Sequence, residues 1–253
     1  MPIKAAVANF SVKHLDEELI DMWVKVGCDE FLIAVETGSP EMQKKIHKNI
    51  DLAAVRNLLQ IFQRKKIHVI AMYMIGFPGE TLGQINETLN AVKSLRASHS
   101  QILLVVPFPG TQLFSDAMKD SLLNFDVNDL EIYQRSTNWI KSDEWDYPML
   151  KEMAYDVNIE VNFLNNSFCD FPEGRKYKID FYKILLKGLP GHVIAHIMLG
   201  YLTQDPTYYS QAKELLKSDS LNQTFGKYLS WNFPAIVEFK QYLQKEMAAS
   251  GVV

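Results

Sequence analysis

The sequence predicts an α/β fold with an open parallel sheet over residues 1–120, followed by an all-α region over residues 121–253. Short apolar runs alternate with amphipathic segments in the first part, which is the pattern of repeated strand–helix–strand units. Beyond residue 120 the strand pattern fades, an irregular stretch with Trp139 and Trp145 extends to Pro148, and helical spacing then takes over. Right-handed crossovers make the strands of such units parallel, so we expect their carboxyl ends to meet at one rim.

The first strand and helix are expected within residues 5–27. Residues 5–8 are apolar and predict the strand. Asp16 is expected to cap the helix, because an aspartate side chain accepts a hydrogen bond from a free N–H group of the first turn. Gly27 is expected to end it, since glycine readily takes the left-handed conformation found at helix ends. The apolar residues between them recur at helical spacing: Leu19, Met22, Trp23 and Val26.

The second strand is expected at residues 31–35, and two helices follow it. Ser39 with Pro40 predicts the start of a short helix through Ile46, because proline suits the first position of a helix. The next helix begins after Asp51. Its apolar residues share one face: Val55, Leu58, Leu59 and Phe62.

The third and fourth strands are expected at residues 67–75 and 102–106. After the third strand, Thr81 and Gln84 have the spacing of a capping box, in which each side chain bonds the other residue's backbone N–H. Both strands run into turns rich in proline and glycine, and a helix containing Phe114 follows the second of these turns. Four parallel strands in an open half-barrel, with helices on the outer face, are therefore predicted.

The region after residue 120 is expected to be helical. Helices are predicted at residues 150–165 and 179–187. Two antiparallel helices joined by a turn at Asp205 and Pro206 are expected within residues 190–218. That hairpin resembles a single tetratricopeptide-like unit, although one copy shows no internal period.

Composition and charge exclude several classes of protein. The net charge of −4 gives no basic footprint for nucleic acid. No apolar run approaches the roughly 20 residues of a membrane helix, so we expect a cytoplasmic protein that binds neither nucleic acid nor membrane. With only two cysteines, a disulfide framework is excluded, and Cys28 is expected to be a buried structural thiol. His192 and His196 lack a third metal ligand in a zinc-enzyme pattern, which favours helix packing and predicts no metal site in this chain.

Three short segments follow predicted strands and therefore belong to the expected rim. They are residues 36–39, 76–81 and 107–111. A carboxylate and hydroxyl groups in the first segment can bond a ribose, and the glycines of the second let backbone approach a flat ring. Each segment alone is also explained as a turn or a helix cap, with Glu80 at the start of a helix where its charge suits the dipole.

Taken together, these segments resemble the second half of the radical S-adenosylmethionine (SAM) core, especially the branch that often carries an upstream cobalamin-binding domain. The resemblance covers about residues 5–120. It rests on Gly27-Cys28 before a strand that ends in Glu-Thr-Gly-Ser, then on Gly-Phe-Pro-Gly-Glu-Thr at residues 76–81, then on Pro-Phe-Pro-Gly-Thr at residues 107–111.

The resemblance implies a set of SAM-binding residues. Glu36 and Ser39 would contact the ribose and neighbouring polar groups. Lys48 would face the methionine carboxylate, although a lysine near a helix C-terminus is also explained by the helix dipole. The remaining members of the implied set are Thr37, Gly38 and Pro107, together with Ile75, Gly76, Phe77 and Pro78, which would pack against the adenine.

The sequence departs from the family pattern in one large respect. The Cys-x-x-x-Cys-x-x-Cys loop that binds the 4Fe-4S cluster is missing, as is the Gly-Gly-Glu-like stretch that grips the methionine amine. The resemblance implies that the intact parent uses the cluster and SAM, with cobalamin as a further cofactor of this branch, on a substrate that the sequence does not identify. We expect this chain to be a fragment, a half encoded apart from its first half, or a degenerate remnant, inactive alone.

The alternative hypothesis is a non-catalytic scaffold or interaction module derived from a radical SAM core. Under either hypothesis the first strand lacks a neighbour on its outer side in this sequence, and a bare strand edge invites pairing with another chain. We therefore expect either self-association or pairing with the missing half.

Overall fold

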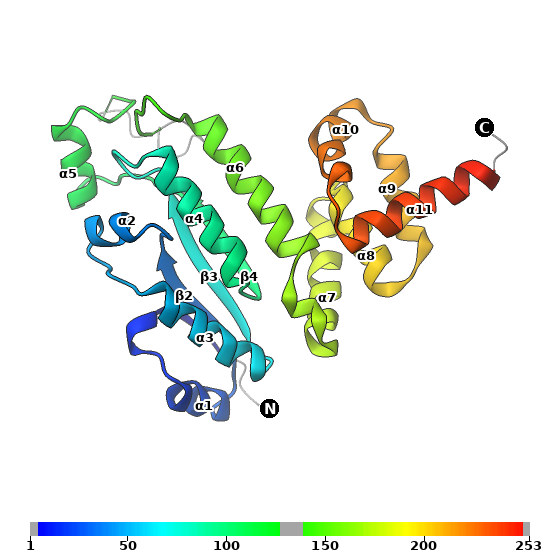
Figure 1. Ribbon diagram of the computed structural model, residues 1–253, viewed down its shortest axis with the longest axis horizontal. Coiled ribbons are helices and arrows are strands. Elements are labelled where there is room, and N and C mark those ends of the chain that lie inside the picture. Colours follow the sequence, from blue (N-terminus) through cyan, green and yellow to red (C-terminus); the bar gives the residue numbers. More distant parts are fainter. Residues whose placement is uncertain (1–4, 127–138, 250–253) are drawn as a thin grey trace. The chain divides into compact units, whose positions relative to one another are not determined.

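The computed structural model describes residues 5–126 and 139–249, with the backbone alone for residues 5–11 (Figure 1). The chain forms two compact units, one of residues 1–158 and one of residues 159–253.

A parallel sheet with four strands forms the centre of the first unit. The strands lie in sequence order as neighbours: β1 (Ala5–Ser11), β2 (Cys28–Glu36), β3 (His68–Ile75) and β4 (His99–Leu104). All three neighbouring pairs are parallel, and the sheet does not close on itself within the described residues. The predicted open parallel sheet is confirmed.

Helices form the crossovers between the strands, and Figure 1 shows α3 and α4 lying across one face of the sheet. Their starts agree with the sequence, since Asp16, Asp51 and Thr81 each accept a backbone N–H bond as N-caps. The complete capping box of Thr81 and Gln84 is also present. These helices are α1 (Glu17–Lys25), α2 (Pro40–Lys45), α3 (Leu52–Arg64) and α4 (Leu82–Leu95).

The two faces of the sheet differ in burial, as the alternation of side chains along a strand requires. Phe31 is fully buried under the helices, where its ring lies 5.0 Å from that of Phe62. The buried residues of the central strands on that side are Phe31, Ile33, Val35, Val69, Ala71, Tyr73 and Ile75. The alternate positions are only half-buried and form an open apolar face: Leu32, Ala34, Ile70, Met72 and Met74.

The fourth strand was expected at residues 102–106, and this prediction is wrong in position. The strand runs from His99 to Leu104, where His99 pairs with Ile70 and Leu104 with Ile75. Its first residues are polar, because β4 is an edge strand whose Gln101 is exposed to solvent. An apolar run therefore could not reveal where the strand begins.

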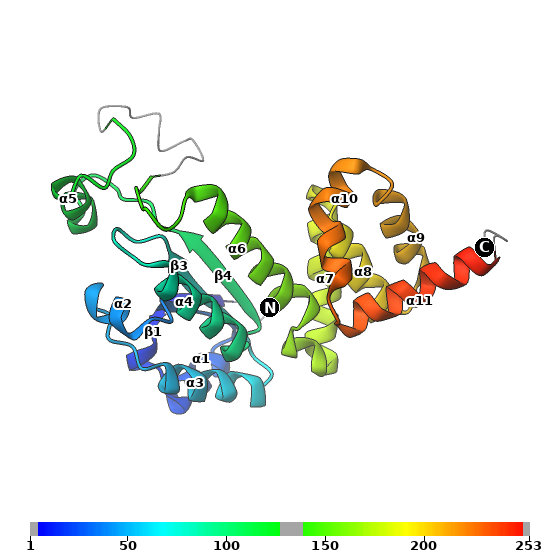
Figure 2. The ribbon, with the colours of Figure 1, turned by 45° about the horizontal axis from the view of Figure 1, so that its top comes forward.

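After β4 the first unit continues with helices. They are α5 (Gln112–Lys119), capped by Thr111, and α6 (Tyr147–Ile159), which lies alongside β4 (Figure 2). An isolated antiparallel bridge joins Leu123 to Ile140. The compact unit thus extends to residue 158, and the domain boundary expected near residue 120 stays a prediction.

The second unit is helical wherever it is described. A π-helical turn, η3 (Glu160–Leu164), follows α6 along the chain. Helices α8 and α9 pack against each other, with Pro206 opening α9. The likeness of this pair to a tetratricopeptide unit stays a prediction. The remaining elements are η4 (Ser167–Asp170), α7 (Pro172–Gly188), α8 (Val193–Thr203), α9 (Pro206–Leu215), α10 (Asp219–Phe225), η5 (Gly226–Ser230) and α11 (Pro234–Ala249).

In the part of the chain that the structure describes, every helix is too short or too polar to cross a lipid bilayer.

Candidate functional site

The register of the sheet brings the segments after β2, β3 and β4 to one edge. Glu36 pairs with Tyr73, and Ile75 pairs with Leu104. The N–H of Val105 donates to the carbonyl of Ile75 at 3.0 Å, which extends the contact just past the strand ends. Because all strands point the same way, the three segments singled out in the sequence share the carboxyl rim.

Glu36 and Lys48 meet at this rim in an ion pair. The Nζ atom of Lys48 lies 2.9 Å from Oε1 of Glu36, and the two side chains are 49% and 12% exposed. Glu36 closes β2 with a φ of 70°. The sequence placed both residues in a ligand site, but it gave no sign that they contact each other across the loop between α2 and α3. Because Lys48 is half-exposed, the pair contributes only about 1 kcal/mol, and a polar ligand can replace one partner of it.

Thr37 and Gly38 face helix α4. The hydroxyl oxygens of Thr37 and Thr88 are 2.8 Å apart, and the N–H of Gly38 donates to the Thr88 hydroxyl at 3.1 Å. A Cβ atom on Gly38 would stand 2.4 Å from the Cβ of Ala91, so only glycine fits there. Both residues therefore fix the rim to the helix layer.

Ser39 is the other polar residue of this segment. It is fully buried, and its Oγ has no hydrogen-bond partner in the described structure. Its position as N-cap of α2 is confirmed, but its side chain makes no capping bond. A buried hydroxyl without a partner is uncommon in a native protein and is typical of a group that serves a ligand or a water molecule.

The turn after β3 is built around the carboxylate of Glu80. Its Oε2 accepts the N–H groups of Gly76 at 2.7 Å and Phe77 at 2.9 Å. The interpretation of Glu80 as a residue at the helix start is wrong. Helix α4 begins only at Leu82, and the side chain of Glu80 is turned back into the Gly-Phe-Pro-Gly turn, where it is 2% exposed.

Burial raises the pKa of Glu80 to about 7, although the N–H groups of Phe77 and Gly76 and the charge of Lys45 act in the opposite direction. Lys45 also donates from Nζ to the carbonyl of Pro78 at 2.6 Å. The sequence did not single out Lys45, because a lysine in the last turn of a helix is explained by the helix dipole.

Apolar packing holds the same turn from two sides. Phe77 is buried and packs with Met42 and Val105. Gly76 has a φ of +85°, and a Cβ there would stand 2.9 Å from Leu150. The indole Nε1 of Trp145 donates to the carbonyl of Glu80 at 2.8 Å. Trp145 comes from a stretch whose sequence pattern is irregular, and its hydrogen bond helps to hold the turn after β3.

Other sequence-predicted members of the site are largely enclosed by protein. Ile75 is fully buried, and Pro78 and Pro107 are also buried. Phe108, which follows Pro107, is 56% exposed. The rim thus combines a rigid apolar floor with exposed groups at Lys48 and Phe108.

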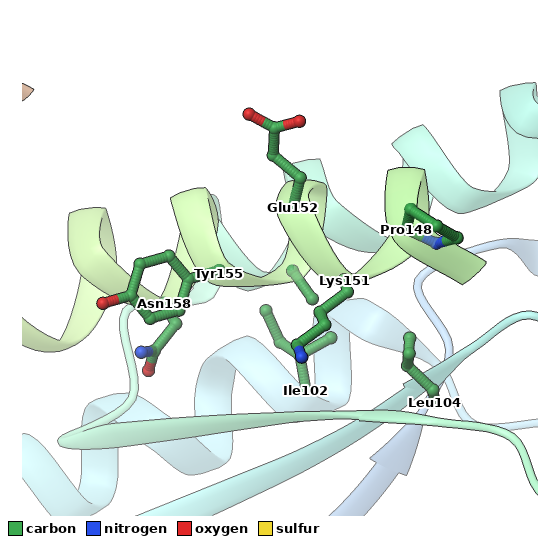
Figure 3. Close-up of a pocket in the computed structure, with 8 residues that line it drawn as sticks. Ile102, Leu104, Pro148, Lys151, Glu152, Tyr155 and Asn158 are labelled. Carbon is green, nitrogen blue, oxygen red and sulfur yellow. The ribbon is translucent and has the colours of Figure 1, made fainter. Parts of the chain in front are cut away.

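A separate cavity of about 600 Å³ lies between α6 and β4. Figure 3 shows Ile102 and Leu104 of β4 directed toward α6, with Lys151 reaching down from the helix. Since Ile102 and Leu104 pair with Tyr73 and Ile75, this cavity lies on the helix-covered face. It is distinct from the open face formed by Met72 and Met74.

Metal ligation finds no support in the described ranges 5–126 and 139–249, where His, Cys, Asp and Glu side chains form no group of three. Cys28 is buried and donates to the carbonyl of Glu30, so the prediction of a buried thiol is confirmed. His192 caps α8 through its Nδ1, and His196 contacts the carbonyl of Pro190. Both histidines therefore take part in the backbone bonding around the start of α8.

Comparison with known proteins gives a family match for the region that carries Glu36 and Gly76. Residues 8–92 match the model of the radical SAM superfamily. An uncharacterized methyltransferase of Pyrococcus horikoshii is 26% identical over 116 residues, which are 46% of this chain and 25% of the relative. The bacteriochlorophyllide d C-12(1)-methyltransferase of Chlorobaculum tepidum is 25% identical over 128 residues, which are 50% of this chain and 28% of the relative.

Among solved structures, the radical SAM methyltransferase TsrM from Kitasatospora setae aligns with a TM-score of 0.41 at 18% identity, over 46% of this chain and 23% of its own. Coproporphyrinogen III oxidase from Escherichia coli aligns with a TM-score of 0.43 at 15% identity, over 61% of this chain and 31% of its own. The relatives from Pyrococcus and Chlorobaculum are longer proteins, and this chain matches only between a quarter and a third of their length.

Proposed function

We propose, from the match of residues 8–92 to the radical SAM superfamily, that the sheet of this chain is the SAM-binding wall of a methyl-transferring radical enzyme. The observation that carries the proposal is the shared rim. The register of β2 and β3 brings the Glu36–Lys48 pair and the Gly76 turn to the same edge of an open sheet. Methyl transfer is proposed because it is the activity named for the relatives from Pyrococcus and Chlorobaculum.

The residues at the rim suit the chemistry of SAM. The carboxylate of Glu36 is an acceptor for ribose hydroxyl groups, and the ammonium group of Lys48 suits the methionine carboxylate. The unpartnered, buried Oγ of Ser39 is a further polar group for a ligand in this region. Met72 and Met74 on the open face provide polarizable apolar surface for a substrate or an adenine ring.

When bound to a reduced cluster, SAM supplies a carbon-centred radical. The roles proposed for this chain are to bind SAM, orient it and shield it from water. Glu36 would hold the ribose and Lys48 the methionine carboxylate, and the turn held by Glu80 would shape the apolar contact with the adenine ring.

The cluster itself does not fit the residues of this chain. A 4Fe-4S cluster that keeps one iron for SAM needs three protein thiolates, and the sequence has two cysteines. Cys28 is buried in β2 and bonded to a carbonyl, which leaves it unsuited to ligation. We propose that the cluster ligands come from polypeptide other than these 253 residues and that this polypeptide pairs with the outer edge of β1.

Binding of SAM to the purified chain tests the proposal. We expect weak, saturable binding in equilibrium dialysis with labelled SAM, because a single wall covers only part of the ligand. Glu36→Ala and Lys48→Ala should each weaken it about three- to tenfold. The matched control is Lys44→Ala, an exposed lysine in the last turn of α2.

Two results would contradict the proposal. One is an absence of SAM binding at millimolar concentration, and the other is binding that Glu36→Ala and Lys48→Ala leave unchanged. Anaerobic reconstitution with iron and sulfide should give no stoichiometric cluster with this chain alone. A cluster together with release of 5′-deoxyadenosine from SAM would show that the chain is catalytically complete.

A further inference from the structure

The backbone at Glu36 forms an unusually tight turn. The N–H of Thr37 donates to the carbonyl of Val35 at 3.0 Å, and Glu36 between them has a φ of 70°. This is a γ-turn with positive φ, which is rare and strained for a residue other than glycine. The pairing of β2 with β3 is irregular at the same point, between Ala34 and Glu36.

The loop that carries Lys48 is strained in the same way. His47 has a φ of 57° and Asn49 a φ of 48°, so left-handed residues flank Lys48 on both sides. Such backbone conformations are unfavourable for residues other than glycine and persist only where the surrounding structure holds them in place. The two members of the ion pair therefore both stand on backbone that requires external support.

Gln43 of α2 lies between these two segments and bonds to both. Its Nε2 donates to the carbonyls of Val35 and Thr37, both at 2.7 Å. Its Oε1 accepts the N–H of Ile50 at 3.1 Å. Its own carbonyl accepts the N–H groups of Lys48 at 3.0 Å and Asn49 at 3.1 Å.

This bonding uses the whole side-chain amide. Gln43 is 2% exposed, and both of its amide hydrogens and its oxygen have protein partners. The two carbonyls that it binds are those on either side of Glu36. A glutamate at this position would keep an acceptor for Ile50 but lose the pair of donors, and a methionine would lose all three bonds.

We propose that Gln43 is a positioning residue that locks the Glu36 turn and the Lys48 loop into one rigid unit and so sets the affinity of the rim for SAM. The proposal rests on the proposed function, because it assigns Glu36 and Lys48 to the ligand. Gln43 itself acts only through them. Rigid support of this kind lowers the ordering cost that a ligand would otherwise meet on binding.

Two substitutions separate the two ends of this support. Gln43→Met removes every side-chain bond, and Gln43→Glu keeps only the acceptor for Ile50. The control is Gln112→Met, because Gln112 is exposed on α5 and its amide bonds only the neighbouring Asp116. Thermal unfolding of each variant establishes that it is folded.

Amide hydrogen exchange measured by NMR reads the support directly. In Gln43→Met the N–H groups of Thr37 and Ile50 should both exchange faster. In Gln43→Glu only Thr37 should lose protection. The dissociation constant for SAM should rise about tenfold in both variants, since the turn at Glu36 is released in both, and should stay unchanged in Gln112→Met.

The proposal is overturned if folded Gln43→Met or Gln43→Glu binds SAM as tightly as the unaltered chain. If the unaltered chain does not bind SAM, the proposed function fails, and a double-mutant cycle then decides the role of Gln43. Glu36→Gln and Lys48→Met should show a coupling in thermal stability that is lost when Gln43→Met is added. A coupling that survives Gln43→Met would overturn the positioning role.

Discussion

Glu80 is the residue in which burial and function are most directly connected. Its carboxylate accepts two backbone N–H groups in the Gly76 turn, yet burial raises its pKa to about 7 from an ordinary 4.5. A carboxyl group whose pKa is raised on folding stabilises the protein at low pH. That contribution is lost as the pH rises from 4.5 through 7.

Glu80→Gln should therefore remove this pH dependence. The amide oxygen of glutamine can accept the same N–H groups without carrying a charge. We expect the variant to match the unaltered chain at pH 5 and to be more stable at pH 8, by up to about 3 kcal/mol. Urea denaturation across this pH range measures the difference. A variant that is less stable at pH 8 would show that the charge itself holds the turn.

Gly38 provides a second test of the rim at the scale of one residue. Gly38→Ala places a methyl group 2.4 Å from the Cβ of Ala91 and 2.8 Å from the carbonyl oxygen of Glu87. The variant should lose about 1–3 kcal/mol of unfolding free energy, because strand end and helix must separate.

The matched control is Gly83→Ala in the first turn of α4, where the nearest atom to the new methyl group is 3.7 Å away. This change should be neutral or stabilising by up to about 1 kcal/mol, since alanine favours helices. Chemical denaturation measures the unfolding free energy of both variants. An equal decrease in both would mean that the close approach of Gly38 to α4 does not contribute to stability.

For single residues, the sequence indicated which residues follow the strands but not the hydrogen bonds that hold them. Position after a strand was enough to select Glu36 and Gly76, since parallel strands end at one edge. The bonds of Gln43 were missed, because they join residues whose approach depends on two left-handed turns with no glycine in them. Trp145 was missed for a similar reason, since no local pattern relates it to a turn 65 residues earlier.

Single elements were predicted where a local signal specifies them. The starts of α1, α3 and α4 follow from capping side chains, and β2 and β3 follow from apolar runs. Strand β4 was displaced in the prediction because its first residues are polar at a sheet edge. The helix expected over residues 150–165 is α6 followed by the π-helical turn η3. Helix propensity does not distinguish a π-helical turn from an α-helix, so η3 was not predicted.

The turn η3 places a carbonyl where a buried lysine can reach it. The carbonyl of Asn162 accepts Tyr182 Oη at 2.9 Å and faces Lys178 Nζ at 3.5 Å. Lys178 is fully buried in α7, and its Nζ lies 5.6 Å from the centre of the Phe181 ring. Burial lowers the pKa of Lys178 to about 8 from 10.5. Holding the charged form inside the protein therefore costs stability below pH 8, and the cost disappears as the pH rises toward 10.5.

Lys178→Met should accordingly stabilise the chain. We expect a gain of about 1–3 kcal/mol at pH 7 that declines between pH 8 and pH 10. The matched control is Lys183→Met on the same helix, which replaces an exposed lysine and should change little. Denaturation curves measured at pH 7 and at pH 10 test this expectation. A loss of stability in Lys178→Met would show that the bond to Asn162 outweighs the desolvation of the charge.

For the whole molecule, the unpaired outer edge of β1 has the largest consequence. In the sheet as described, β1 pairs only with β2, and β1 is seven residues long. A long strand with free N–H and carbonyl groups is a template for another strand. The sequence predicted this edge because the pattern of strands gives their order, but it could not identify the partner.

The purified chain is therefore expected to self-associate as its concentration increases. Sedimentation over a wide concentration range measures this, and a polypeptide that supplies the neighbouring strand should suppress it. A chain that stays monomeric throughout, without such a polypeptide, would count against the role of β1 as a pairing edge.

The contact between Trp145 and the Gly76 turn gives the protein an optical reporter of its own. The indole is 5% exposed, donates to the carbonyl of Glu80 and lies beside Gly76. The emission of an indole responds to the polarity and hydrogen bonding around it, so a ligand that moves this turn will change the fluorescence of Trp145. With the other tryptophans, Trp23, Trp139 and Trp231, replaced by phenylalanine, a single fluorophore would follow events at the rim without any added label.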